Sequence, residues 1–222
     1  MCRLALMNNE GIKYIEGWYG LENLFNYLER QLGGHGNGIC FIYNDGSYYI
    51  KKGVNLSNKE IAKEVLMKIK NIKWIIYHTR LASVGSISDE NCHPFENNGR
   101  VMAMNGTERN YVVVNKNLTD TENILLSTEN IMNDTRKYHS VFLGYENGKV
   151  FANKNYGSLE YMPCGNGGKV FASCLPAEYH TRDYIYEAPE YFVEGVKIKH
   201  LEPVRQTRYY DYGVYGYYKA NY

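Results

Sequence analysis

The second residue of the chain, Cys2, combines two groups that can do chemistry together once Met1 is removed. A cysteine is a good nucleophile only as the thiolate, and an ordinary thiol with a pKa of ~8.5 is barely ionised at neutral pH. A free α-amine titrates at ~7.7–8.0, so its neutral form can take the thiol proton, directly or through a water. One residue would then supply nucleophile and base. Alone the pattern is weak, because a penultimate cysteine permits removal of Met1 in any protein.

Two segments further along carry side chains that could bind a polar substrate. The glycine-rich stretch 33–38 holds one imidazole, His35, where glycines permit positive φ and close backbone approach. A predicted strand ends in His78-Thr79-Arg80, and an arginine where a strand opens into a loop suits bidentate binding of a carboxylate. The glycine-rich stretch could equally be an ordinary loop, and Arg80 could equally form a surface salt bridge.

Two more segments suit the stabilisation of charge. A predicted strand ends in Asn105-Gly106, and such a turn offers a side-chain N–H and a backbone N–H that can together hold an oxyanion. The segment 119–122 begins a predicted helix, for which Thr119 or Asp120 is a natural N-cap. The Asp120 carboxylate could also pair with a substrate ammonium.

The bulk composition narrows the class of protein. With 25 Lys and Arg against 24 Asp and Glu, the formal net charge is +1, which gives no reason to expect a nucleic acid or an anionic membrane as partner. The five cysteines show no metal-ligand spacing, and Cys40 and Cys174 lie in apolar runs typical of buried thiols. No cofactor is expected. The chain has neither a signal-peptide pattern nor an apolar run of the ~18–20 residues that span a membrane, so we expect a cytoplasmic protein.

Hydrophobic periodicity predicts a domain in which strands dominate. Helical spacing covers residues 21–32, 58–69 and 121–132, and the segment 44–47 marks a hairpin turn. Strands are predicted over residues 2–7, 38–43, 48–52, 74–78, 101–104, 140–145, 149–152, 169–173 and 193–200. We expect one α+β domain over residues 2–205, with helices stacked on paired antiparallel sheets.

Tyrosine is the compositional oddity, with 23 residues, and several of them lie in a predicted tail over residues 206–222. A tail, a strand packed on the surface and a docking segment all fit this composition, since tyrosine gives a large contact area at low entropy cost.

In this order and spacing the motifs closely resemble class II glutamine amidotransferase domains, which belong to the N-terminal-nucleophile hydrolases. That family starts with Cys and carries a His-Thr-Arg strand end, an Asn-x-His-Pro segment, a His-Asn-Gly turn and a Thr-Asp-Ser/Thr-Glu helix start. The corresponding residues here are Cys2, His78-Thr79-Arg80, Asn91-Cys92-His93-Pro94, Asn105-Gly106 and Thr119-Asp120-Thr121-Glu122. The glycine-rich stretch around His35 is more similar to the small stand-alone members than to those fused to a synthase.

The resemblance implies a four-layer αββα sandwich of two antiparallel sheets, and a chemistry. Cys2 would attack the side-chain amide of glutamine, with Asn105 and Gly106 as the oxyanion hole. Ammonia would leave, and the resulting γ-glutamyl thioester would be hydrolysed to glutamate. The residues implied to bind substrate are Arg80 for the α-carboxylate and Asp120 for the α-ammonium, with His78 and His35 as further candidates. A separate ammonia-accepting synthase subunit is the expected partner unless the enzyme acts alone.

The chain departs from the family at several positions. Met104 stands where the family has a histidine before Asn-Gly, so the usual imidazole support of the turn is missing. Leu81 and Val84 replace an aromatic residue and a histidine in the loop that closes over glutamine. Cys92, inside the His-Pro segment, is expected to be a buried thiol.

Three alternatives stay open on the sequence. The same chemistry could act on a different γ-glutamyl amide. The chain could instead be a catalytically idle interaction subunit that uses its tyrosine-rich tail as the contact. A metal site would have to be assembled from side chains whose spacing matches no known zinc pattern, namely Cys2, His35, His78 and His93.

Overall fold

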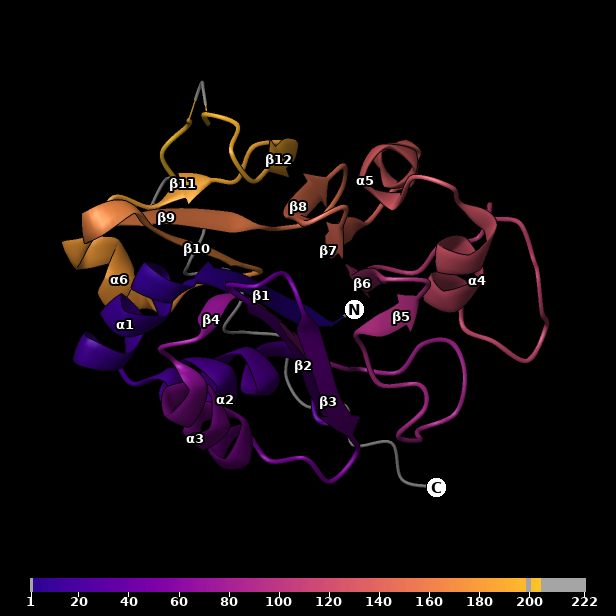
Figure 1. Cartoon of the computed structure of the whole chain (residues 1–222), viewed down its shortest axis with the longest axis horizontal. Coiled ribbons are helices and arrows are strands. Elements are labelled where there is room, and N and C mark those ends of the chain that lie inside the picture. The colour runs from indigo at the N-terminus through magenta and orange to yellow at the C-terminus, as the bar shows by residue number, and fades with distance from the viewer. Residues whose placement is uncertain (1, 199–200, 205–222) are drawn as a thin grey trace.

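Two antiparallel sheets stacked face to face form the centre of the molecule (Figure 1). The structure is a computed structural model that describes residues 2–198 and 201–204. The predicted tyrosine-rich tail, residues 206–222, therefore lies outside the described residues.

The first sheet has seven strands in the order β11-β9-β10-β1-β4-β2-β3. Its strands are β1 (Arg3–Asn8), β2 (Asn37–Tyr43), β3 (Tyr48–Gly53), β4 (Ile72–Thr79), β9 (Glu160–Cys164), β10 (Gly168–Ala172) and β11 (Tyr186–Glu187). The second sheet has five strands in the order β12-β8-β7-β6-β5. These are β5 (Phe95–Asn97), β6 (Arg100–Asn105), β7 (Val141–Glu146), β8 (Lys149–Lys154) and β12 (Tyr191–Val193).

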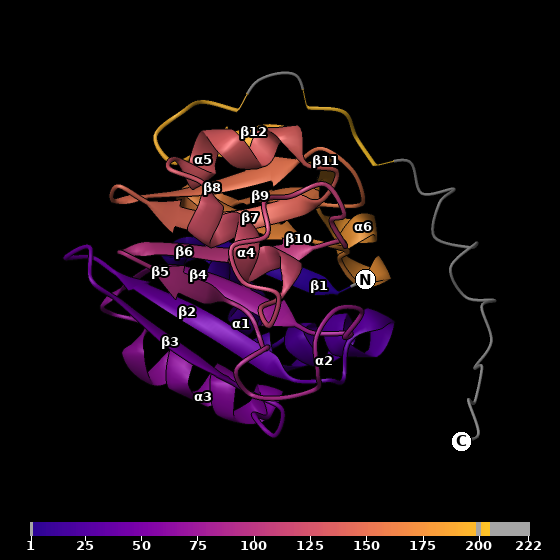
Figure 2. The same cartoon turned by 90° about the vertical axis from the view of Figure 1, so that its right-hand side faces the viewer.

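Helices cover the outer face of each sheet, with α3 and α5 at opposite ends of the stack (Figure 2). Those on the first sheet are α1 (Asn9–Trp18), α2 (Leu21–Leu32), α3 (Asn58–Lys68) and α6 (Ala177–Arg182). Those on the second are α4 (Asp120–Ser127) and α5 (Ile131–Asp134), followed by a 3-10 turn over Thr135–Lys137. The predicted four-layer αββα sandwich of two antiparallel sheets is confirmed.

The four layers enclose three apolar cores, and the alternation of side chains along the central strands supplies them. In β1, Ala5 and Met7 face the helices, while Leu4 and Leu6 face the second sheet; all four are fully buried. Successive side chains of a strand point to opposite faces, so a strand buried on both faces is apolar throughout.

The strand β6 alternates in the same way within the second sheet. Val101 and Ala103 face the first sheet, whereas Met102 and Met104 face α4 and α5. This packing fixes the register of β6 and so fixes the position of its last residue, Asn105.

Helix α2 and the β2–β3 hairpin form where the sequence predicts them, but the predicted helix over 121–132 is wrong. Helix α4 ends at Ser127 because Thr128 is extended and its hydroxyl donates to the Ile124 carbonyl. Asn130 then caps a separate helix, α5, by accepting from the Asn133 N–H. Side chains of Thr and Asn compete with the helical ladder in this way.

The predicted strand over 193–200 is also wrong, because β12 ends at Val193 and the chain turns there. Gly195 has a positive φ of 86°, and the Val196 N–H donates back to the Val193 carbonyl. Helix α1 was not predicted, since its two glycines obscure the pattern. A Cβ on Gly11 would lie 2.5 Å from the Lys169 carbonyl oxygen, so α1 needs this glycine to pack against β10.

The cysteines are all free, and two of the expected buried thiols, Cys40 and Cys92, are buried. Cys174 is only partly buried, so that expectation was wrong in degree.

Leu6 tests the core between the sheets. Leu6→Ala should leave a cavity and lower the free energy of unfolding by about 2–5 kcal/mol, measured by urea denaturation. Met67 on α3, which is 68% exposed, is the control, and Met67→Ala should change it by less than about 0.5 kcal/mol. Equal losses would contradict the placement of Leu6 between the sheets.

Candidate active site

The start of β1 and the end of β6 meet at one edge of the stacked sheets. The backbone nitrogen of Cys2 donates to Oδ1 of Asn105 at 2.7 Å, and this nitrogen becomes the α-amine when Met1 is removed. The Asn105 side chain has one accepting end and one donating end. Because its accepting end faces Cys2, its NH₂ group points away and is available to a ligand.

The Cys2 thiol lies under a loop and is only 6% exposed. Its Sγ accepts the Leu81 N–H at 3.4 Å and lies 3.6 Å from the Leu81 carbonyl oxygen. Burial raises the pKa of the thiol, and the Asp120 charge raises it further, while the Leu81 N–H and the Arg80 charge oppose the shift. The thiol is therefore protonated at neutral pH and needs a base before it can attack.

Gly106 follows Asn105 in a turn that admits no side chain. A Cβ built on Gly106 would lie 2.0 Å from the hydroxyl oxygen of Ser140. The glycine is thus required by contact with Ser140, just before β7. That its N–H and the Asn105 amide form a pair of donors stays a prediction.

Arg80 follows the end of β4 and is 3% exposed. Its Nη1 donates to the Ser86 carbonyl and its Nη2 to the Val84 carbonyl, both at 2.7 Å. The guanidinium therefore holds the loop 81–86 in place, and its other N–H groups are left for a second acceptor. Its charge lies close enough to Cys2 to lower the pKa of that thiol.

Asp120 is the first residue of α4 and is 5% exposed. Thr119 is the N-cap, in a reciprocal pair of hydrogen bonds with Glu122, so Asp120 is not needed to cap the helix. Its carboxylate accepts the backbone N–H groups of Glu108 and Thr121, each at 2.9 Å. Burial raises its pKa, which the two N–H groups partly offset.

The two candidate histidines lie in different places. His35 is half-buried beside the loop, and its Nδ1 accepts the Ala82 N–H at 3.0 Å. His78 is fully buried beneath the end of β6, out of reach of a ligand at the surface. The structure thus brings His35 to the loop that covers Cys2 and His78 to the floor of the site.

His78 supports the strand that carries Asn105. Its Nε2 lies 3.2 Å from the Met104 carbonyl oxygen and 2.8 Å from Nδ1 of His93. Burial lowers the pKa of both rings, that of His78 to about 3, so both are neutral. Since a carbonyl only accepts, we assign the proton to His78 Nε2. The imidazole of His78, on β4, thus contacts the backbone of the residue just before Asn105.

The loop 81–86 also contacts the turn that contains Gly106. The hydroxyls of Ser83 and Thr107 share a hydrogen bond of 2.8 Å. Together with the Arg80 contacts, this bond fastens the loop over Cys2.

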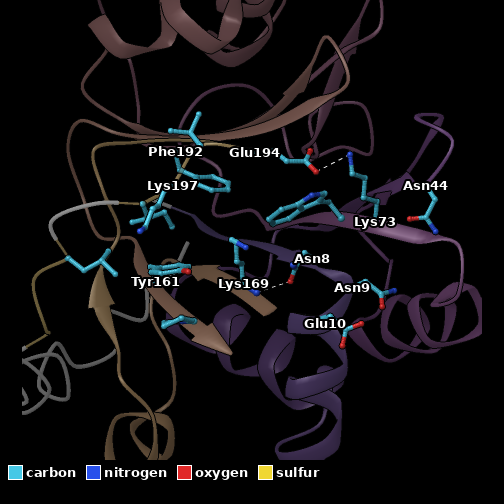
Figure 3. A pocket seen from close by; sticks show the side chains of 16 residues that line it. Asn8, Asn9, Glu10, Asn44, Lys73, Tyr161, Lys169, Phe192, Glu194 and Lys197 are labelled. Carbon is cyan, nitrogen blue, oxygen red and sulfur yellow. Dashed lines mark hydrogen bonds and ion pairs between the residues drawn. The ribbon is translucent and has the colours of Figure 1, made fainter. Parts of the chain in front are cut away.

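A cavity of about 700 Å³ opens at the far end of β1 from Cys2 (Figure 3). Asn8 and Asn9 line it on one side and the Lys73–Glu194 ion pair on another. Residues 196–198 and 201 form part of its rim. None of the candidate site residues lines this cavity, so its size does not bear on them.

Within the described residues, no cluster of three or more His, Cys, Asp or Glu side chains is arranged to hold a metal ion. No helix in the same part of the chain has both the length and the apolar character needed to cross a membrane.

The fold is shared with known amidotransferases, although no family model and no curated sequence matches the chain. The glutamine phosphoribosylpyrophosphate amidotransferase of B. subtilis matches 78% of this chain over 42% of its own, with 16% identity and a TM-score of 0.50. An allosteric regulatory enzyme of purine biosynthesis matches the same shares, with 18% identity and a TM-score of 0.53. A glutamine aminotransferase class-II domain protein from Silicibacter pomeroyi has a TM-score of 0.48 and 13% identity over 77% of this chain and 88% of its own.

These likenesses show the fold, which is that of class II glutamine amidotransferase domains. The resemblance seen in the sequence motifs is thereby confirmed at the level of structure. The chain corresponds to less than half the length of the two enzymes, 42% of each.

Several residues of the site escaped the sequence analysis. Leu81 contacts Cys2 through its backbone, which leaves no trace in residue type. Ser140 lies just before β7, where no motif draws attention to it. Glu108 stands two residues after Gly106, and an acidic residue that close to the Asn105-Gly106 turn is the one sequence feature that points to it.

The buried histidine pair predicts a loss of stability in acid. The unfolded chain binds protons at His78 and His93 at about pH 6.5, whereas folded His78 does so only near about 3. Their contribution is therefore complete above about pH 6.5 and falls as the pH falls, by about 2 kcal/mol for His78 at pH 5 and in the same direction for His93. Urea denaturation at pH 7 and pH 5 measures it. A His78→Gln/His93→Gln variant should lose less on acidification than the wild type; an equal loss would show that the pair is not the cause.

Proposed function

We propose that the chain is a glutamine amidotransferase-type amidohydrolase with Cys2 as its N-terminal nucleophile. The observation that carries the proposal is the hydrogen bond from the Cys2 nitrogen to Asn105 Oδ1. It brings the nucleophile, its base and a donor for the oxyanion into one cluster.

The reaction follows from this arrangement. The neutral α-amine takes the thiol proton, and Sγ attacks the carbon of the substrate's side-chain amide. The carbonyl oxygen becomes an oxyanion that the Asn105 side-chain N–H and the Gly106 backbone N–H hold. The ammonium of Cys2 then gives its proton to the amide nitrogen, and ammonia leaves as the thioester forms. The amine next deprotonates a water, which attacks the thioester and yields glutamate and the free thiol.

The substrate's charged ends would be bound by two buried groups. The Arg80 guanidinium retains N–H donors for the α-carboxylate, and the Asp120 carboxylate would accept from the α-ammonium. An analogue that lacks either end would leave a buried charge unpaired, which makes the pair a specificity device. In this proposal His35 borders the site, and His78 supports it from below without touching substrate.

Access to Cys2 requires the loop 81–86 to move. The thiol is 6% exposed, and the Ser83–Thr107 hydrogen bond fastens the loop over it. With the loop closed over bound substrate, water is kept from the thioester's surroundings until ammonia has left.

The proposed reaction releases ammonia. We propose that the partner is an ammonia-accepting synthase domain or subunit in the cytoplasm. One of the two longer enzymes that share the fold is an amidotransferase that acts on phosphoribosylpyrophosphate, as its name states.

Covalent labelling tests the nucleophile. Untagged protein with Met1 removed should gain one adduct at Cys2 with the glutamine mimic 6-diazo-5-oxo-norleucine, located by peptide mass spectrometry. Cys2→Ala should take no adduct and release no ammonia from glutamine while keeping its melting temperature. A residue added before Cys2 blocks the amine and should abolish both reactions. Normal turnover in Cys2→Ala would end the proposal.

Asp120→Asn tests recognition of the α-ammonium. Removing the charge should raise KM for glutamine by about 30-fold or more with a much smaller effect on kcat, because a buried charge pair is lost. Asp45→Asn, the same change in the exposed β2–β3 hairpin, is the matched control. An unchanged KM would mean that Asp120 only organises the start of α4.

A further inference from the structure

Beneath the Asn105–Gly106 turn lies a buried polar pair, Glu108 and Ser140. Glu108 is 8% exposed and Ser140 is 1% exposed. The Ser140 hydroxyl donates to Oε1 of Glu108 at 2.5 Å. Burying a carboxyl group costs free energy unless hydrogen bonds replace those that it made to water. The bond from Ser140 is such a replacement.

Ser140 forms the floor of the turn. A Cβ on Gly106 would lie 2.0 Å from the Ser140 hydroxyl oxygen and 2.6 Å from its Cβ. The hydroxyl would otherwise be free to rotate, but Glu108 accepts its hydrogen bond and so fixes its direction. The peptide that presents the Gly106 N–H therefore rests on an oriented hydroxyl.

Glu108 also reaches the other half of the site through its backbone. Its N–H donates to Oδ2 of Asp120 at 2.9 Å, within the protein interior. The short segment 106–108 thus joins the oxyanion turn to the carboxylate that would bind the substrate ammonium.

We propose that Glu108 and Ser140 are positioning residues for the oxyanion hole. Ser140 holds the Gly106 N–H in its direction, and Glu108 holds the Ser140 hydroxyl while its N–H holds Asp120. The kinetic part of this inference rests on the proposed function. The structural part, that the pair orders the turn, does not.

The kinetic test separates kcat from KM. The oxyanion forms only as the substrate reacts and is absent from the bound ground state, so misplacing its donor should lower kcat and leave KM almost unchanged. Removing one such donor outright costs about 10²–10³-fold, and we expect Ser140→Ala, which only misplaces it, to cost about tenfold. The matched control is Ser127→Ala on α4. The Ser127 hydroxyl donates to the Ile124 carbonyl of its own helix, so this variant should stay near the wild-type kcat.

Two changes at Glu108 separate the hydrogen bond from the bulk of the side chain. Glu108→Gln keeps an oxygen that accepts from Ser140 and should retain kcat within about threefold. Glu108→Ala removes the acceptor and should lose about tenfold, as Ser140→Ala does. If Glu108→Ala does not fold, the smaller change Ser140→Ala still decides.

A second measurement needs no turnover. Hydrogen exchange followed by NMR should show the Glu108 amide, which donates to Asp120, exchanging about tenfold faster in Ser140→Ala and Glu108→Ala, with Met102 in the middle of β6 unchanged. Glu108→Gln should match the wild type. Unchanged Glu108 exchange, or an active wild type with unchanged kcat in Ser140→Ala, overturns the inference. A wild type that releases no ammonia overturns the proposed function instead, and faster Glu108 exchange would still support the positioning role.

Discussion

The contact between the Cys2 nitrogen and the Asn105 amide is the interaction on which the rest of the site depends. Its two partners begin a strand of one sheet and end a strand of the other, so it exists only if the sheets are stacked in the correct register. A one-residue slip in either strand would move each of its side chains into the core on the opposite face of the sheet. The side chains would no longer fit those cores, so the register is fixed. The position of Cys2 relative to Asn105 is therefore set by the packing of apolar side chains in the cores around β1 and β6.

Polar groups buried around that contact make the site rigid. His78 supports the end of β6 through the Met104 carbonyl, and Ser140 lies against the following glycine. Buried polar groups are costly, but in a low-dielectric interior a satisfied hydrogen bond is strong and directional. The strand end that carries Asn105 is thus held by a buried imidazole of the other sheet.

Under the proposed function, Arg80 would have two tasks that conflict. Its guanidinium holds the loop 81–86 through two carbonyls, and the same group would bind the substrate carboxylate. A bidentate carboxylate uses N–H groups in the same plane, so binding at Arg80 and the position of the loop are linked. Because Cys2 is almost completely covered, this link would decide when the proposed nucleophile becomes accessible.

The sequence by itself determined the motifs, the helix α2 and the β2–β3 hairpin, because periodicity and turn chemistry are local in the chain. The αββα class followed from the family resemblance that the order of the motifs carries. It misjudged the segments 121–132 and 193–200, where Thr128, Asn130 and Gly195 end elements through individual hydrogen bonds and dihedral angles. Only the tertiary structure decided which side chains support the turn. Glu108 and Ser140 are 32 residues apart, and no local pattern encodes a contact that arises from stacking two sheets.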